Sequence, residues 1–318
     1  MQKRLRIFPQ HSTVTLRPRL ACEVTLDGVV AAREENSLES SALTAFAPLL
    51  PGSVVPALNA PNFPFPARIV AALRQALDQI VERDRKLTLV VPDAAVRVLL
   101  LDFDSLPDKT ADVLPIIRFR LRKLLPFEVD DAAISYQVMT RDSNQVRALV
   151  AVTPHAVLGE YEAVVREAGY EPGAVLPSTL CAIAAIPDDA DALVVNQNAV
   201  CITTAITKQN EVLLHRTLDL HAASPEETGA ERGGDDTPDI QQAVSVAIAY
   251  FEDSLRTPLE SLYYVGPGGA IAFGGKLSQP DWGSPQIQIR DLVEPPVPGV
   301  ASPVPTGLLA GVTGALAN

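Results

Sequence analysis

The sequence predicts an α/β protein built from at least two structural units. Its 318 residues exceed the usual size of a domain with one hydrophobic core. Because 47% of the residues are hydrophobic and 20% are charged, the chain has enough apolar side chains to fill such cores. Segments with the alternation of strands and segments with helical periodicity are interspersed along the chain. This mixture favours sheets flanked by helices.

The N-terminal part predicts a hairpin followed by a helix. Residues 20–35 have the pattern of a strand, a turn at Asp27-Gly28 and a second strand. Residues 40–66 are rich in proline and irregular, with a short strand expected at their centre. Residues 67–86 predict an amphipathic helix, because apolar side chains recur at helical spacing. These side chains are Ile69, Leu73, Leu77 and Ile80.

A short helix before Pro126 concentrates positive charge in a chain whose net charge is −12. Asp112 is the expected N-cap, which places Pro115 in the first turn, and Pro126 ends the helix. The basic face carries Arg118, Arg120, Arg122 and Lys123. The opposite face carries an apolar stripe of Ile117, Leu121 and Leu124.

Strands are expected on both sides of this helix. Residues 87–103 predict two strands interrupted at Pro92-Asp93. Residues 132–139 and 145–153 predict two more strands around a polar turn. The next helix begins at Pro154 and closes at Gly169, and a short strand and a short helix follow it. The acidic turn at 187–191 is the expected domain boundary.

Beyond that turn the sequence predicts a second α/β unit. Residues 192–220 have the pattern of three strands in an antiparallel meander. Residues 221–238 are acidic and rich in glycine and proline, which is typical of a flexible loop. A long helix at 239–256 leads to a strand at 261–266 that runs into a glycine-rich turn. A short apolar helix is expected within 306–318.

Composition argues against several classes of function. The acidic balance, with an isoelectric point near 4.8, opposes nonspecific binding to nucleic acid. No run approaches the roughly 18 apolar residues of a membrane span, so we expect a cytoplasmic protein. The three cysteines, Cys22, Cys181 and Cys201, stand singly in apolar runs and are expected to be buried and reduced.

No catalytic or metal-binding motif stands out. The histidines His11, His155, His215 and His221 are scattered and form no metal-ligand spacing. His215 is expected as a half-exposed strand residue. The sequence contains no G-x-S-x-G motif and no cysteine in a glycine-rich setting. We therefore expect no catalytic residue, no bound metal and no enzymatic activity.

The order of landmarks within residues 89–139 resembles the PilM family of type IV pilus assembly proteins, relatives of the actin-like cell-division protein FtsA. These landmarks are Pro92, Leu106-Pro107, Pro126-Phe127 and Ser135-Tyr136-Gln137-Val138. The helix and glycine at 160–175, the long helix and glycine turn at 240–277, and the closing helix are similar in order. The resemblance extends over most of the chain from residue 17 onward.

The resemblance implies an actin-like ATPase fold. It has two related lobes with mixed sheets flanked by helices, a small subdomain inserted in the first lobe, and here a reduced roof subdomain in the second. The implied units are a basic N-terminal segment (1–16), the first part of the first lobe (17–103), the inserted subdomain (104–170), the return to the first lobe (171–188) and the second lobe (189–318) with the acidic loop 221–238.

Actin-like nucleotide sites use two Asp-x-Gly loops, and both have changed here. Asp acts through Mg²⁺ and water, and glycine lets backbone N–H groups approach phosphate. The first loop has Glu23 and Thr25 in the two places, and the second has Asn196 and Asn198. We therefore expect no ATP hydrolysis and no cofactor, with ATP and Mg²⁺ as the alternative.

A third element of the nucleotide site, the glycine turn after residue 265, leaves two interpretations open. Its glycines are Gly266, Gly268 and Gly269. The turn is either a remnant adenosine cradle or simply a tight turn after a strand, and the tight turn is favoured. The 221–238 interval is also too short to build a subdomain over a nucleotide.

The function that the resemblance implies is a cytoplasmic scaffold at the bacterial inner membrane. Such a scaffold binds the cytoplasmic N-terminal peptide of a PilN-like membrane protein in a groove beside the inserted subdomain, and it self-associates. Membrane contact is peripheral, through partners, and no nucleic acid is involved. The alternatives are an active actin-like ATPase of a pilus or secretion machine, a cytoplasmic platform subunit of a type II secretion system, or an actin-like adaptor outside pili.

The basic helix has two interpretations in this setting. Its four cations, Arg118, Arg120, Arg122 and Lys123, form either a solvated face or an edge that faces the inner membrane or an acidic partner. Phe127 is either a core residue or the lip of the peptide groove, and core packing is favoured.

Overall fold

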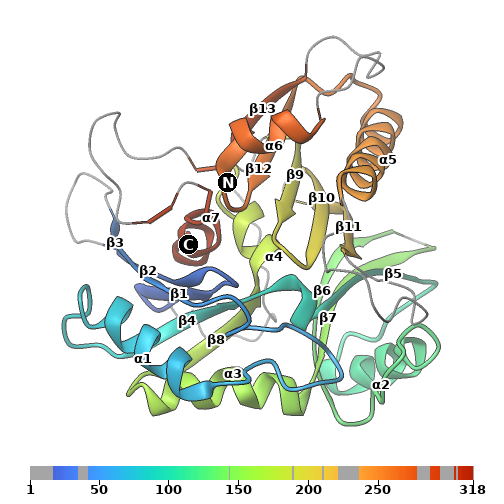
Figure 1. Cartoon of the computed structure of the whole chain (residues 1–318). Helices are drawn as coiled ribbons and strands as arrows, with labels where there is room; N and C mark the ends of the chain where they lie inside the picture. The colour runs from blue at the N-terminus through green and yellow to red at the C-terminus, as the bar shows by residue number, and fades with distance from the viewer. Residues whose placement is uncertain are drawn as a thin grey trace, which may run out of the picture.

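The computed structural model describes residues 17–34, 42–142, 144–187, 190–209, 211–220, 236–277, 287–293, 304–305 and 307–317. These residues form two five-stranded sheets and one three-stranded sheet, with helices packed against them (Figure 1). The α/β class with two lobes and a small inserted unit is therefore confirmed. Two predicted segments, 1–16 and most of the acidic loop 221–238, lie outside the described residues, as do His11 and His221.

The first lobe is built on a sheet with the strand order β3-β2-β1-β4-β8. Its strands are β1 (Leu20–Val24), β2 (Gly28–Glu34), β3 (Ala42–Pro48), β4 (Lys86–Val91) and β8 (Glu171–Pro177). The first three strands pair antiparallel, and β4 and β8 continue the sheet parallel to β1. Helices α1 (Pro66–Leu77) and α3 (His155–Glu167) contribute buried side chains to the same core as this sheet.

The second lobe repeats this topology with the order β11-β10-β9-β12-β13. Its strands are β9 (Ala192–Gln197), β10 (Cys201–Lys208), β11 (Glu211–Asp219), β12 (Ser261–Val265) and β13 (Gln288–Asp291). Again three antiparallel strands are followed by two parallel ones. Helices α5 (Thr237–Leu255) and α6 (Gly269–Leu277) share a core with it.

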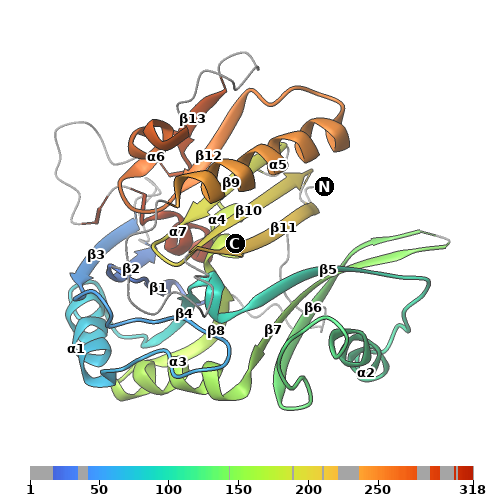
Figure 2. The same ribbon diagram turned by 45° about the vertical axis from the view of Figure 1, so that its right-hand side comes forward.

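A smaller sheet, β5-β7-β6, is inserted into the first lobe between β4 and α3. It comprises β5 (Arg97–Phe103), β6 (Ala132–Arg141) and β7 (Val146–Pro154), with α2 (Thr110–Leu121) packed on one face. Figure 2 shows this unit extending away from the first lobe below β11. The inserted unit thus begins before residue 104, at β5, and α3 belongs to the first-lobe core rather than to the insert.

Helical spacing explains the buried faces. On α1 the predicted side chains Ile69, Leu73 and Leu77 are fully buried, and Ile80 is buried just beyond the helix. Gly169 closes α3 with a φ of +93°, a conformation that glycine adopts readily. The central strands β1 and β9 are buried on both faces, as expected for strands covered by helices on each side.

The C-terminal helix α7 (Ala310–Leu316) returns to the first lobe and crosses α4 (Ser178–Ile183). The crossing is close because Gly314 has no Cβ. A Cβ placed there would lie 1.7 Å from the carbonyl oxygen of Cys181. Cys22, Cys181 and Cys201 are all free and buried, as predicted.

Helix α2 differs from its prediction at both ends. It begins at Thr110 after the N-cap Lys109, so Asp112 is not the cap and Pro115 lies inside the helix. The buried face runs Val113, Ile117, Leu121, and this packing against the small sheet fixes the start of the helix. Because regular helix ends at Leu121, the following turn exposes Leu124, whose side chain was expected on the apolar stripe.

Two further expectations were wrong. Strand β3 lies at the start of the proline-rich segment rather than at its centre, where it pairs with β2. His215 is 9% exposed, not half-exposed, because β11 lies against the short 3₁₀ turn Asp93–Ala95 of the first lobe. No helix in the described part of the chain is long and apolar enough to cross a membrane.

Candidate functional site

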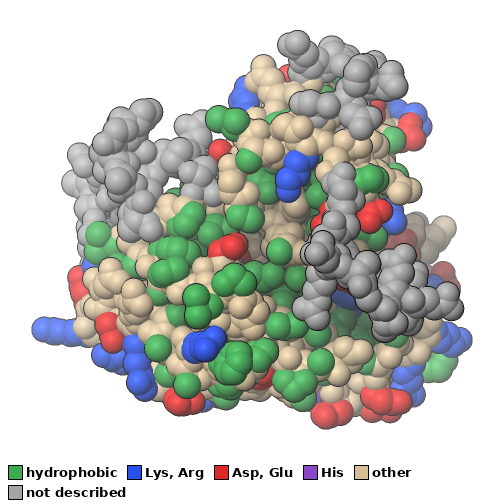
Figure 3. All heavy atoms as spheres, viewed as in Figure 1, with side chains coloured by type: hydrophobic (Ala, Val, Ile, Leu, Met, Phe, Trp, Pro, Cys, Tyr) green, Lys and Arg blue, Asp and Glu red, His purple; other side chains and the backbone are tan. Residues whose placement is uncertain are grey.

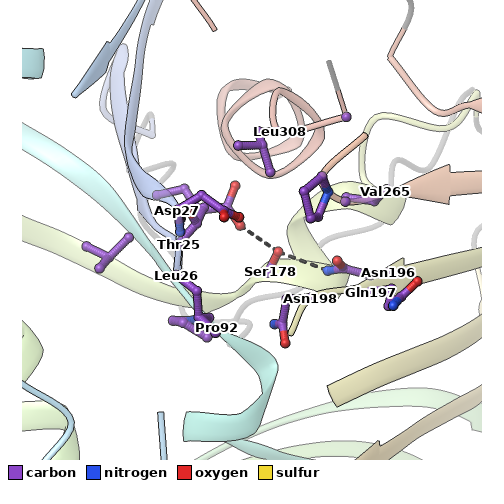
Figure 4. Close-up of a pocket in the computed structure, with 15 residues that line it drawn as sticks. Thr25, Leu26, Asp27, Pro92, Ser178, Asn196, Gln197, Asn198, Val265 and Leu308 are labelled. Carbon is purple, nitrogen blue, oxygen red and sulfur yellow. Dashed lines mark hydrogen bonds between the residues drawn. The ribbon is translucent and has the colours of Figure 1, made fainter. Parts of the chain in front are cut away.

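Five of the seven predicted nucleotide-loop residues line one small cavity where the lobes meet (Figure 4). These residues are Glu23, Thr25, Asn196, Asn198 and Gly266. The cavity has a volume of about 30 Å³, close to that occupied by one water molecule in the liquid. Pockets for small organic ligands are typically about 300–1,000 Å³. Gly268 and Gly269 are not among the lining residues.

Glu23 extends from β1 into this region and is 6% exposed. Ser178 Oγ donates a hydrogen bond of 2.6 Å to Glu23 Oε1. The other carboxylate oxygen faces Gly311 of α7, where a Cβ would lie 2.1 Å from Oε2. Burial raises the pKa of Glu23 to about 7, against the Ser178 hydrogen bond and with a smaller contribution from the negative charge of Asp93.

Asn196 connects the second lobe to the first. Its Nδ2 donates to Ser178 Oγ and Thr179 Oγ1 at 3.0 Å and to Asp93 Oδ2 at 3.3 Å. Asp93, which is 3% exposed, also accepts from the backbone N–H of Thr179 at 3.0 Å and from the Thr179 hydroxyl. The bonds therefore tie β9 to the 3₁₀ turn Asp93–Ala95 and to the start of α4, across the interface between the lobes.

Sequence reasoning missed Asp93, Ser178 and Thr179. Each carried a signal. Asp93 is a carboxylate between two buried apolar strands, where an unpaired charge would be costly. Ser178 and Thr179 follow Pro177 at the start of a short helix, a position typical of side chains that bond nearby polar groups.

Thr25 and Asn198, which the sequence resemblance assigns to the two loop-glycine positions, stabilise turns. Thr25 Oγ1 accepts from the backbone N–H of Gly28 at 3.0 Å and donates to the Gly28 carbonyl at 2.8 Å. Asn198 Oδ1 accepts from the N–H groups of Val200 and Cys201, both at 2.9 Å. Both side chains thus close hairpins, between β1 and β2 and between β9 and β10.

The glycine turn after β12 contacts other parts of the chain. Gly266 has a φ of +144°, and a Cβ there would lie 2.3 Å from the carbonyl oxygen of Gln197. Its N–H donates to the carbonyl of Gly307 at 3.0 Å. Gly268 and Gly269 also have positive φ and lead into α6. In this geometry the turn packs against the β9–β10 turn and the C-terminal segment.

Contacts within the chain itself therefore close most of the cleft between the lobes. Leu308 and Gly307 of the C-terminal segment line it beside the two hairpin turns (Figure 4). Among the described residues, no group of three or more His, Cys, Asp or Glu side chains is placed to hold a metal ion. The hydrogen bonds of Asn196 hold the two lobes together. Glu23 can take up a proton near neutral pH, because its pKa is raised to about 7.

A second and larger cavity, about 260 Å³, lies between the first lobe and the small sheet. Strand β8 and helix α3 form one side, and β6 and β7 form the other. Its lining is largely apolar and includes Ile134, Val152, Leu158, Tyr161 and Val175. Ser135, Thr153 and Glu162 add a few polar groups. We call this cavity the groove. Figure 3 shows a broad group of hydrophobic side chains over the first-lobe part of the face in view.

The four predicted cations of α2 separate into two pairs. Arg118 donates to the backbone carbonyls of Val129, Asp130 and Ala132, and Arg122 forms an ion pair with Asp130. Arg120 and Lys123 are exposed, and Lys123 Nζ lies 5.1 Å above the ring of Phe119.

Phe127, which follows the basic helix, is partly buried. It packs against the core of the small sheet, in agreement with the favoured prediction.

The two lobes of equivalent topology, meeting at a cleft below paired hairpin turns, define an actin-like fold. The chain is similar to a solved structure described as the PilM-PilN type IV pilus biogenesis complex. The TM-score is 0.63 at 15% identity, covering 82% of this chain and 87% of the other. This similarity confirms the predicted fold.

Two other solved structures match with lower scores. The cytoplasmic domain of EpsL, an inner membrane component of the type II secretion system of Vibrio cholerae, matches with a TM-score of 0.46 at 11% identity, covering 78% of this chain and 82% of the other. A protein with an actin-like ATPase fold from Bacteroides thetaiotaomicron matches with 0.47 at 9% identity, covering 81% and 86%. No protein-family model and no curated protein sequence matches this chain.

Proposed function

We propose that this chain is a non-enzymatic scaffold that binds an extended peptide at the cytoplasmic face of a bacterial inner membrane, in a type IV pilus assembly platform. The observation that carries the proposal is the position of the groove. It lies between two sheets at the edge strand of each, whereas the cleft between the lobes leaves a cavity of about 30 Å³.

The groove suits an extended peptide because both strands at its sides have an open edge. Among the strands that the structure describes, β6 pairs only with β7, and β8 pairs only with β4. An edge strand presents backbone N–H and C=O groups that an added strand can pair with. Apolar lining residues then accept alternate side chains of the peptide, while Ser135 and Glu162 provide polar contacts.

The proposed partner is the cytoplasmic N-terminal segment of a PilN-like single-pass membrane protein. The similarity to the PilM-PilN complex supports this choice. Membrane attachment through that partner makes a membrane-spanning helix in this chain unnecessary. Self-association of the scaffold completes the proposal, and nucleic acid has no part in it.

The proposed scaffold works without nucleotide or Mg²⁺. Glu23 and Asn196, which the sequence resemblance assigns to the two metal-liganding positions, form hydrogen bonds to Ser178 and Thr179. Opening room for a nucleotide would break these bonds and separate Gly266 from Gly307. Catalysis is therefore not part of the proposed function.

The test is titration of a synthetic peptide, corresponding to the cytoplasmic N-terminus of a PilN-like protein from the same genome, into two tryptophan variants. Ala133 lies at the groove on the edge strand β6 and is partly exposed, so Ala133→Trp fills the groove without burying a new side chain in a core. The matched control is Ala156→Trp, on an exposed position of α3 that does not line the groove.

We expect the peptide to bind the unmodified chain and the Ala133→Trp variant to bind at least about tenfold more weakly. The Ala156→Trp variant is expected to match the unmodified chain. Absence of binding to the unmodified chain, or equal binding by all three proteins, would contradict the proposal.

A further inference from the structure

Helix α2 carries a second apolar stripe on its exposed side. Its buried side packs on the small sheet through Val113, Ile117 and Leu121. On the solvent side Ile116 is 38% exposed and Phe119 is 60% exposed. Lys123 is also exposed and lies four residues after Phe119, in the turn that follows the helix. Leu124 and Arg120 flank this row and are exposed too. We call Ile116, Phe119 and Lys123, with these two neighbours, the α2 stripe.

Helix α5 of the second lobe carries a stripe with the same pattern and the opposite charge. Val246 is 45% exposed and Tyr250 is 42% exposed, and Asp253 follows them on the same side of the helix. Asp239 lies on this side nearer the start of α5. The other side of α5 is buried in the second-lobe core. We call Val246, Tyr250 and Asp253 the α5 stripe.

We propose that these two stripes are the two halves of one head-to-tail interface between copies of this chain. The order along each helix is aliphatic, aromatic, charged, with spacings of three and four residues in α2 and four and three in α5. Parallel packing therefore brings Ile116 against Val246, Phe119 against Tyr250, and Lys123 against Asp253. Arg120 adds a second cation at the acidic end of the α5 stripe.

A second copy of the chain would cover both the α2 stripe and the α5 stripe, whereas any other binding partner considered would match the charge of one stripe alone. An anionic bilayer or an acidic peptide would match the cations of α2 but not the carboxylates of α5. Within one chain the stripes are apart, since α2 lies on the inserted sheet and α5 on the second lobe (Figures 1 and 2). Because the two halves differ, each association leaves one stripe of each kind free, so assembly continues into a ring or filament.

The interface rests on the self-association included in the proposed function, but it is independent of peptide binding. The groove residues lie mainly on β6, β7, β8 and α3, with Val91, Ala95 and Val96 from the segment around the 3₁₀ turn, and they include no member of either stripe. Two single-helix surfaces make a small contact, so we expect micromolar or weaker association. A membrane partner that concentrates the copies would then promote assembly.

The test uses charge reversal in the full chain, followed by sedimentation velocity from about 1 to about 200 µM. Lys123→Asp and Asp253→Lys each place like charges in the interface. We expect each variant to self-associate at least about tenfold more weakly than the unmodified chain. The double variant, Lys123→Asp with Asp253→Lys, restores opposite charges and is expected to recover association. Lys86→Asp, an exposed reversal outside both stripes, is the control.

Three results would overturn the interface: an unmodified chain that stays monomeric, single reversals that leave association unchanged, or a double variant that does not recover. Co-sedimentation with vesicles containing phosphatidylglycerol tests the bilayer directly. Vesicle binding that Lys123→Asp abolishes, while association is unaffected, would also overturn it. Titrating the peptide into the same variants separates the two proposals, because peptide affinity is expected to be unchanged in all of them.

Discussion

Glu23 is a buried carboxyl whose contacts explain its behaviour at the scale of a single residue. The longer carboxyl reaches Ser178 on α4 and is enclosed by Gly311 on α7. In this position it is removed from water, and burial raises its pKa to about 7. The carboxyl therefore titrates near neutral pH, unlike an ordinary exposed glutamate.

The raised pKa predicts how stability depends on pH. The unfolded chain loses the Glu23 proton near its ordinary value of 4.5, whereas the folded chain keeps it to about 7. The contribution of Glu23 to the free energy of unfolding therefore falls as pH rises between these values and stays low above them. Glu23→Gln removes the titration. We expect the variant to be more stable than the unmodified chain by roughly 2–3 kcal/mol at pH 8 and by under about 1 kcal/mol at pH 5.

Urea unfolding at the two pH values measures this difference. Glu171→Gln, an exposed carboxyl on β8, is the control and is expected to follow the unmodified chain at both. A Glu23→Gln variant whose stability relative to the unmodified chain does not change with pH would contradict the account of Glu23.

Arg118 and Arg120 are close in sequence but differ in their contacts. Arg118 holds the segment between α2 and β6 through three backbone carbonyls, and Arg120 points to solvent. We expect Arg118→Ala to lower the free energy of unfolding by about 1–2 kcal/mol, because three carbonyls, two of them in partly buried hydrogen bonds, lose a charged donor. Arg120→Ala is expected to change it by less than about 0.5 kcal/mol. Equal effects of the two substitutions in chemical denaturation would show that Arg118 has no such role.

At the scale of elements, the crossing of α4 and α7 depends on glycine. Gly314 meets the carbonyl of Cys181, a backbone atom that cannot move without displacing α4. Gly275, near the end of α6, is also helical, but a Cβ there would meet nothing within 4 Å. Both glycines are helical, and they differ in how much room a Cβ would have. Alanine substitutions at the two positions therefore form a matched pair of variants.

We expect Gly314→Ala to destabilise the protein by about 1–3 kcal/mol through overpacking. Gly275→Ala is expected to stabilise it by up to about 1 kcal/mol, because alanine favours the helix. Thermal and urea unfolding of both variants provide the measurement. A Gly314→Ala variant as stable as Gly275→Ala would mean that the helices do not approach as closely as described.

The elements that the sequence predicted best were those whose burial repeats with a fixed period. Ile69, Leu73 and Leu77 share one face of α1, and Gly169 marks the end of α3, so local pattern was sufficient there. Helix α2 was harder because it has apolar side chains on two sides. Its buried stripe is decided by the small sheet, which periodicity alone does not place. Leu124 was expected on the buried stripe, but regular helix ends at Leu121, so helical spacing no longer places its side chain.

The candidate site was predictable only in part. Glu23, Thr25, Asn196 and Asn198 were found because their order fits a known pattern of loops, and the fold does bring them together. Asp93, Ser178 and Thr179 come from different elements and meet only when the lobes dock. The individual groove residues were not predicted, because the lining is ordinary apolar sequence that comes from several separate elements.

For the whole molecule, the lobes are joined by polar contacts where related folds are expected to open around a nucleotide. Asn196 bonds to groups on two first-lobe elements, and the C-terminal segment packs on the turn after β12. Closing the cleft in this way leaves the groove beside the small sheet as the larger of the two cavities described. In the proposed scaffold the partner peptide therefore binds in the groove, and its binding does not depend on a nucleotide in the cleft.

The most direct test of this claim is calorimetric titration of the PilN-like peptide into the full chain with and without millimolar Mg-ATP. We predict that the peptide binds with the same dissociation constant in both conditions. A thermal melt in the same buffers is predicted to show no shift, whereas a nucleotide at 100 times its dissociation constant would stabilise the fold by about 2.7 kcal/mol. Peptide binding that requires Mg-ATP, or a clear melting shift with it, would contradict the account.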